Sequence, residues 1–139
     1  MFQSIIAPVD LAHLSKLERA LEVVAEEARH HNAPVTFVSV TTSAPSAQAH
    51  NPDEFREKLD AFAKDQSEKH GFEATALVVV SNDPTTDVDD TLLRTIEETG
   101  AELVIMASHK PDLADYFWPS NGGKIASHSD ASVFIVRDA

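Results

Sequence analysis

Cysteine is absent from the 139 residues of the chain. Disulfide bonds and thiolate metal sites are therefore excluded, so a hydrophobic core must stabilise the fold. The first ten residues carry no basic stretch before their apolar run, and that run is too short for a signal sequence or a membrane span. We expect a cytoplasmic protein with a single domain over residues 1–139, because this length suits one core.

Basic residues are scarce. Eleven Lys and Arg stand against 23 Asp and Glu, which gives a formal net charge of −12. Such a surface repels phosphate backbones, so we expect neither nucleic-acid nor membrane partners. Only four glycines are present, and they form no Walker loop, dinucleotide fingerprint or nucleophile elbow. Seven histidines show no spacing that converges on a metal. We find no catalytic or metal-binding constellation.

The sequence does contain regularly alternating segments. Apolar stretches rich in β-branched residues alternate with segments of helical periodicity. This alternation predicts parallel β-α-β units with helices on both faces of one sheet. In such a doubly wound sheet, ligands bind at the carboxyl ends of the strands, where the strand order reverses. The expected strands are residues 2–9, 35–40, 74–80, 103–106 and 132–136.

Helix boundaries are marked by residues with special backbone preferences. Apolar residues at helical spacing run from Leu14 to Ala28, and Asn32 follows where a left-handed cap would lie. Asn51 followed by Pro52 marks the start of the second helix. Gly71 and Gly100 are expected to end the second and third helices. A fourth, short helix is expected over residues 120–128.

Two strand ends, one loop and the last strand carry a family resemblance. The motifs are Ala-Pro-Val-Asp at 7–10, Met-Ala-Ser-His-Lys at 106–110, Pro-Ser-Asn-Gly-Gly at 119–123 and Val-Phe-Ile-Val-Arg at 133–137. Their order and spacing along the whole chain resemble the universal stress protein family. The resemblance implies an α/β three-layer sandwich, a five-stranded parallel sheet of order 3-2-1-4-5 with helices on both faces. It also implies a nucleotide pocket between strands one and four.

The resemblance further implies a set of binding residues and a ligand. ATP with magnesium is the expected ligand, although some members of the family bind no nucleotide. A homodimer through strand five is also implied, carried by Val133, Phe134, Ile135 and Val136. The expected binding residues are Ala7, Pro8, Val9, Asp10, Val40, Met106, Ala107, Ser108, His109, Lys110, Ser120, Asn121 and Gly122.

The phosphate-binding motif of the family is altered here. The family pattern has three glycines, the last followed by Ser or Thr, and the matching positions here read Ala107, Lys110 and Pro119-Ser120. The spacer before Pro119 is one residue shorter than the family's. Glycine lets a backbone approach phosphate closely, and proline removes an amide donor. Ser120 could compensate by capping the next helix, and Lys110 by supplying a cation.

Several interpretations stay open on the sequence alone. Asp10 could contact a ribose or a metal-bound phosphate, or it could cap the first helix. The aromatic residues Tyr116, Phe117 and Trp118 would form core if buried and a protein-binding surface if exposed. The protein is then either a regulatory protein that binds a nucleotide or another small anion, or a dimeric interaction module with a vestigial pocket. A slow nucleotide hydrolase is the third and least favoured alternative.

Overall fold

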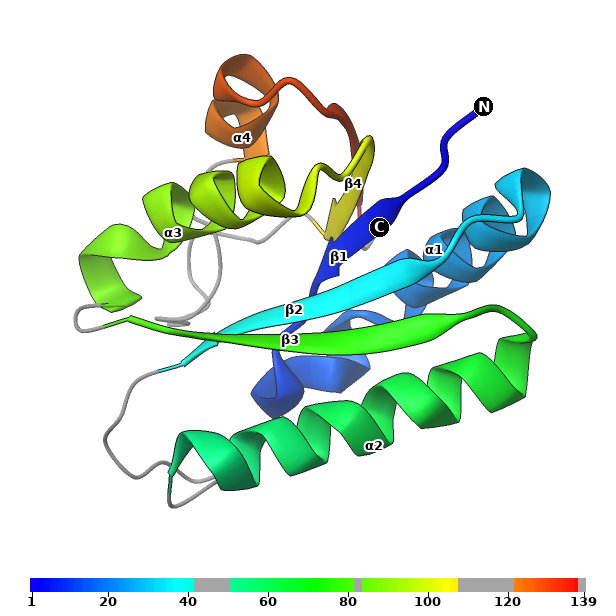
Figure 1. Cartoon of the computed structure of the whole chain (residues 1–139), viewed down its shortest axis with the longest axis horizontal. Coiled ribbons are helices and arrows are strands. Elements are labelled where there is room, and N and C mark those ends of the chain that lie inside the picture. The colour runs from blue at the N-terminus through cyan, green and yellow to red at the C-terminus, as the bar shows by residue number, and fades with distance from the viewer. Residues whose placement is uncertain (42–50, 82–83, 108–121, 138–139) are drawn as a thin grey trace.

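The computed structural model describes residues 1–41, 51–81, 84–107 and 122–137. Strands and helices alternate along the chain, with one 3-10 helix after the first strand (Figure 1). The strands are β1 (Ile5–Pro8), β2 (Val35–Thr41), β3 (Ala74–Val80), β4 (Leu103–Ala107) and β5 (Ser132–Val136). The helices are η1 (Leu11–Lys16), α1 (Glu18–His31), α2 (Pro52–His70), α3 (Pro84–Thr99) and α4 (Gly122–His128).

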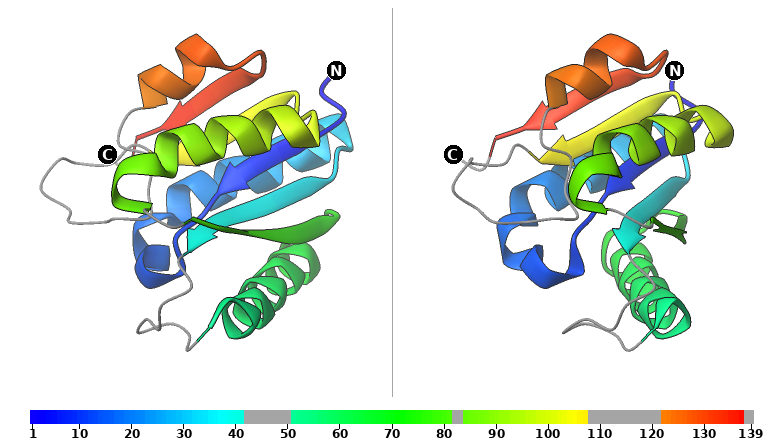
Figure 2. Two further views of the ribbon diagram at one scale, coloured as in Figure 1. Left: turned by 60° about the vertical axis from the view of Figure 1, so that its left-hand side comes forward. Right: turned by 90° about the vertical axis from the view of Figure 1, so that its left-hand side faces the viewer.

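The five strands form one parallel sheet in the order β3-β2-β1-β4-β5. β1 lies at the centre, with Ile5 paired to Val35 of β2 on one side and to Leu103 of β4 on the other. α1 and α2 cover one face of the sheet, and α3 and α4 cover the other (Figure 2). This arrangement confirms the predicted α/β fold and its strand order.

The first strand is shorter than its apolar run. Residues 2–9 were expected to be extended, but β1 begins only at Ile5. The Gln3 backbone N–H donates to the Glu102 carboxylate at 2.7 Å instead of to a neighbouring strand. The Ser4 carbonyl accepts the Leu103 N–H at 3.2 Å. The amino-terminal residues therefore attach the start of β1 to the turn between α3 and β4.

The first helical segment is divided in two. The leucine spacing predicts one helix from Leu14 onward, but the chain forms the 3-10 helix η1 and then α1, separated at Leu17 (φ −106°, ψ 1°). His13 within η1 also departs from helical geometry, with φ −132° and ψ 38°. Leu17 and Val24 are nevertheless buried, so the periodicity identified the correct inward face.

The predicted helix ends are confirmed. Asn32 adopts the left-handed conformation with φ 50°, and Gly71 and Gly100 do so with φ 73° and 67°. The Asn51 side chain accepts the Glu54 N–H at 2.8 Å and caps α2. These residues end or begin helices through their own conformational and hydrogen-bonding properties, which explains why the sequence alone predicted them.

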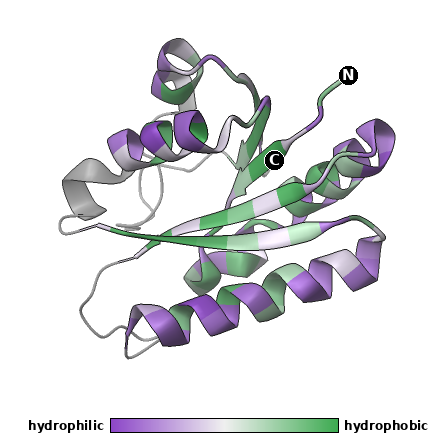
Figure 3. Ribbon diagram, in the orientation of Figure 1, coloured by the Kyte–Doolittle hydropathy of each residue, from purple (hydrophilic) through white to green (hydrophobic). Residues whose placement is uncertain are grey.

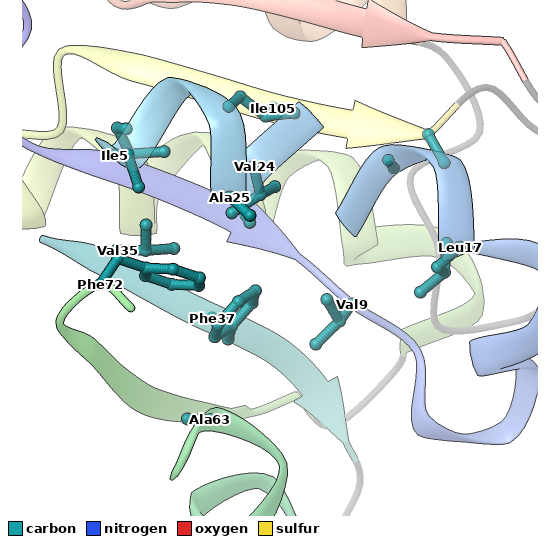
Figure 4. Packing of buried hydrophobic residues seen from close by; sticks show 14 of the residues in the cluster. Ile5, Val9, Leu17, Val24, Ala25, Val35, Phe37, Ala63, Phe72 and Ile105 are labelled. Atoms are coloured by element: carbon teal, nitrogen blue, oxygen red, sulfur yellow. The ribbon is translucent and has the colours of Figure 1, made fainter. Parts of the chain in front are cut away.

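The larger hydrophobic cluster lies between the sheet and helices α1 and α2. Side chains from β1, β2, β4 and α1 meet there (Figure 4). Phe37 is fully buried, and its ring centroid lies 5.1 Å from that of Phe62 and 6.3 Å from that of Phe72. Burying one such side chain contributes roughly 1.5–3 kcal/mol. Hydrophilic residues lie on the outer side of α2 (Figure 3).

A second cluster lies on the α3/α4 face. Because side chains of a strand alternate between faces, Ile6 points into this cluster while Ile5 and Ala7 point into the first. Leu92 of α3 and Ile125 of α4 are buried against the strands here. Within the described residues, no helix is both long and apolar enough to cross a membrane.

Candidate functional site

The topological switch point lies between β1 and β4. The crossover from β1 runs through α1 to β2 on one side, and β4 lies on the other side of β1. In the described part of these strands, β1 pairs with β2 as far as Pro8 but with β4 only as far as Ile6. β4 itself continues to Ala107, which pairs with Val136 of β5. The ladder between β1 and β4 thus stops short of their carboxyl ends, where this fold class binds its ligands.

The chain leaving β1 is attached to β2. The Val9 N–H donates to the Val38 carbonyl at 2.9 Å, and the Val9 carbonyl accepts the Ser39 hydroxyl at 2.6 Å. Ser39 is buried, so this hydrogen bond satisfies its hydroxyl away from water. Both backbone groups of Val9 are therefore engaged, and Asp10 is held at a fixed position directly after the strand.

Asp10 caps the 3-10 helix that follows β1. Its Oδ1 accepts the Ala12 N–H at 2.9 Å, and its Oδ2 lies 2.9 Å from His13 Nδ1. The residue is only 7% exposed. Of the two roles considered for Asp10, the structure contains the helix cap. The other role, contact between the Asp10 carboxylate and a ligand, stays a prediction.

His13 is part of this site, and sequence reasoning had considered it only as a metal ligand. An ionised carboxylate can only accept hydrogen bonds, so the proton between the two side chains belongs to His13 Nδ1. The bond fixes the tautomer and the orientation of the ring. The available signal was an aspartate at the cap position followed by a histidine three residues later, a spacing that brings the two side chains together in a first helical turn.

The other described residues that were predicted to bind the ligand, apart from Gly122, have buried side chains. Ala7, Val9 and Ala107 belong to the cluster beneath α1 and α2, and Met106 belongs to the cluster on the opposite face. Val40 is 5% exposed. These side chains are parts of the core, so a ligand at the strand ends would meet these positions through their backbone atoms.

Most of the remaining predicted residues lie outside the described part of the chain. Ser108, His109, Lys110, Ser120 and Asn121 lie outside the described residues, and so does the aromatic stretch Tyr116, Phe117 and Trp118. Gly122 is the first residue of α4. In the described ranges, no three His, Asp or Glu side chains are grouped as a metal site would require.

Both the sequence and the fold of this chain are similar to those of known proteins. The model of the universal stress protein family matches residues 1–137. The structure is similar to that of a universal stress protein from Archaeoglobus fulgidus, with a TM-score of 0.69 and 19% identity over 97% of this chain and 98% of that one. A structure of the Archaeoglobus fulgidus protein in complex with dAMP matches with a TM-score of 0.67 and 18% identity over 96% and 97%.

A plant protein has the same fold. A universal stress protein family member from Arabidopsis thaliana with AMP bound matches with a TM-score of 0.62 and 13% identity, covering 97% of this chain and 90% of that one. At these identities the structural likeness establishes the fold, while the family model establishes the relationship over nearly the full sequence. The chain belongs to the universal stress protein family.

Proposed function

We propose that the protein is a regulatory binding protein that holds an adenine nucleotide at the carboxyl ends of β1 and β4. The observation that carries the proposal is the switch point itself, where the β1–β4 ladder stops before the strands end. Two proteins of the same fold contain dAMP or AMP in their structures. ATP with magnesium is the first ligand to test, and AMP is the second.

The described residues supply the base of this proposed site. The Asp10 carboxylate accepts hydrogen bonds from Ala12 and His13 on its two oxygens, which fixes its position at the end of β1. One carboxylate suits magnesium only if phosphate oxygens and water supply the other ligands. In this proposal Lys110, Ser120 and the backbone of Asn121 and Gly122 bind phosphate, following the family motif.

Thermal unfolding in the presence of nucleotide tests this proposal. A ligand at about 100 times its dissociation constant stabilises the native state by roughly 2.7 kcal/mol. We therefore expect millimolar ATP with magnesium, or AMP, to raise the Tm. An unchanged Tm with both nucleotides, together with no heat of binding in calorimetry, would refute nucleotide binding.

A substitution at Lys110 tests whether this residue binds the phosphate groups of the nucleotide. Lys110→Ala removes the proposed phosphate cation and should weaken ATP binding more than AMP binding, because ATP carries more phosphate charge. Lys58→Ala is the matched control, since Lys58 is exposed on α2 far along the chain from the motif. Equal ATP affinity in both variants would show that Lys110 does not bind phosphate.

A second candidate function is a dimeric interaction module, and the surface of β5 supports it. β5 is an edge strand of the sheet, and Phe134 and Ile135 are 41% and 36% exposed. An exposed apolar edge favours pairing with another strand, and a second copy of the chain could pair with it across a two-fold axis. Under this candidate function, the phosphate-binding motif is altered because the pocket binds no ligand.

Sedimentation of substituted variants tests whether two copies of the chain pair through β5. Phe134→Lys should yield monomers, because a charge in the paired edge opposes association. Val80→Lys is the matched control, because Val80 is 47% exposed on β3, the opposite edge of the same sheet. A wild-type protein that sediments as a monomer, or a Phe134→Lys variant that stays dimeric, would refute pairing through β5.

A further inference from the structure

A groove separates α3 from the segment that joins α4 to β5. It has a volume of about 770 Å³, and its described lining residues come from three parts of the chain. Its walls come from the second half of α3, from the turn before β4, and from the residues around Asp130 that precede β5. The groove therefore opens at the amino ends of β4 and β5, whereas the proposed nucleotide site lies at the carboxyl ends. Figure 1 shows α3 and α4 on the same side of the sheet.

An ion pair involves Asp90, one of the residues that line this groove. Lys124 Nζ of α4 lies 3.1 Å from Asp90 Oδ1 of α3 and joins the two helices there. The walls also meet where the Ser132 N–H donates to the Glu102 carbonyl at 3.0 Å. The groove is thus a defined space between α3, the turn before β4 and the α4–β5 segment.

The floor of the groove is apolar. Ile96 is buried at its base, and Leu93, Ala101 and Ala131 are half-buried margins of the same hydrophobic cluster. Alanine side chains on the floor leave room above them, and the leucine offers a contact surface. A single aliphatic or aromatic side chain of a partner would find apolar contacts here.

The rim of the groove is acidic. With Asp90 paired to Lys124, the described lining residues include three more carboxylates, of Glu97, Glu102 and Asp130, and the guanidinium of Arg94. All three of these acidic residues are exposed. Glu102 also accepts the Gln3 N–H, which holds its carboxylate at the mouth of the groove. An apolar floor beneath an acidic rim selects for a segment with an apolar side chain between basic ones.

The same charge argues against other occupants. Phosphate groups of a nucleotide would be repelled by the rim, and open α/β sheets bind such ligands at the other end of their strands. A second copy of this chain carries the same net charge of −12, so its surface is poorly matched to an acidic rim.

We propose that the groove between α3 and the α4–β5 segment binds a short basic segment of another protein, anchored by one or two apolar side chains. The basic side chains lie on the carboxylates of Glu97, Glu102 and Asp130, and the apolar anchor lies on Leu93, Ala101 and Ala131. This binding is independent of nucleotide binding and of pairing through β5. It gives the protein a surface through which to contact a partner.

Amide chemical shifts in a titration test the proposal. The probe is the acetylated and amidated peptide Lys-Lys-Leu-Phe-Lys-Lys, added to the full chain labelled with nitrogen-15. We expect saturable shifts centred on Leu93, Ala101 and Ala131. The peptides Glu-Glu-Leu-Phe-Glu-Glu and Lys-Lys-Ser-Ser-Lys-Lys should each bind more weakly, the first because of the rim and the second because of the floor.

Paired variants make the test specific. Glu97→Gln combined with Asp130→Asn removes two exposed rim charges with little effect on folding and should weaken binding roughly three- to ten-fold. Glu57→Gln combined with Asp60→Asn removes two exposed charges from α2 and should change affinity by less than about two-fold.

Four results would overturn the proposal. They are the absence of saturable shifts at millimolar peptide, shifts centred on α2 or β5, equal weakening in the two double variants, and equal binding of the Leu-Phe and Ser-Ser peptides. The last result would reduce the groove to a nonspecific acidic surface. None of these results depends on whether the protein binds ATP.

Discussion

The described residues form a larger buried cluster on one face of the sheet than on the other. On the α1/α2 face, the described residues form a large buried cluster that contains the fully buried Phe37. On the α3/α4 face, the described cluster is smaller, and several of its apolar members, such as Leu93 and Val133, are only half-buried. The groove and the exposed edge strand β5 both adjoin this second cluster. We infer that the first face mainly stabilises the fold and that the second also provides surfaces for binding.

The largest expected effect lies on the α1/α2 face. Phe37→Ala should lower the free energy of unfolding by about 3–5 kcal/mol, because it removes a buried ring packed against Phe62 and Phe72. Urea unfolding followed by circular dichroism measures the change. A loss below about 1.5 kcal/mol would mean that this cluster repacks easily and is not the main source of stability.

The matching substitution on the other face is Leu92→Ala. Leu92 is 1% exposed, so we expect a loss of about 2–3 kcal/mol by the same measurement. The smaller value follows from the smaller side chain and from half-buried neighbours that can move into the space. A loss larger than that of Phe37→Ala would reverse our ranking of the two faces.

The cap at Asp10 supports the α1/α2 face from its edge, because Leu11 and Leu14 of η1 pack against that cluster. Asp10→Ala should lower the free energy of unfolding by about 1–2 kcal/mol through loss of the cap. Asp10→Asn keeps an acceptor for the Ala12 N–H and should cost less. Equal losses in the two variants would indicate that the pairing with His13, and not the cap, is the important contact.

The smallest expected effect is an increase in the free energy of unfolding. Gln66 is 6% exposed on the inward side of α2, and its Oε1 has no hydrogen-bond partner. Gln66→Met replaces it with an unbranched apolar side chain of similar length and should raise the free energy of unfolding by about 0.5–1 kcal/mol. Lys58→Met on the exposed side of α2 is the control and should change it by less than about 0.5 kcal/mol. A destabilised Gln66→Met variant would show that the amide contributes to the packing of this face.

Whether the sequence predicted a feature depends on whether local or long-range interactions create that feature. The caps at Asn32, Gly71 and Gly100 depend on conformational preferences of single residues, so the sequence predicted them. The interruption at Leu17 was missed, because both sides of it satisfy the same apolar periodicity. The order of the strands came from the family resemblance, since periodicity alone leaves the neighbours of β1 undecided.

The candidate site was predicted in part. The motif at 7–10 led to the end of β1, where Asp10 is held, but the sequence left its capping role open and omitted its contact with His13. The spacing of three residues between the two side chains was the one signal for that contact, and it is weak, because the backbone of His13 is not helical.

The sequence by itself determined the element types, the helix ends, the family and the acidic surface, because each depends on local preferences, motif spacing or composition. Only the tertiary structure decided which side chains pack on each face of the sheet and where the groove between α3 and the α4–β5 segment lies. The walls of the groove come from segments far apart in the sequence, and their separation is set by how the helices pack on the twisted sheet.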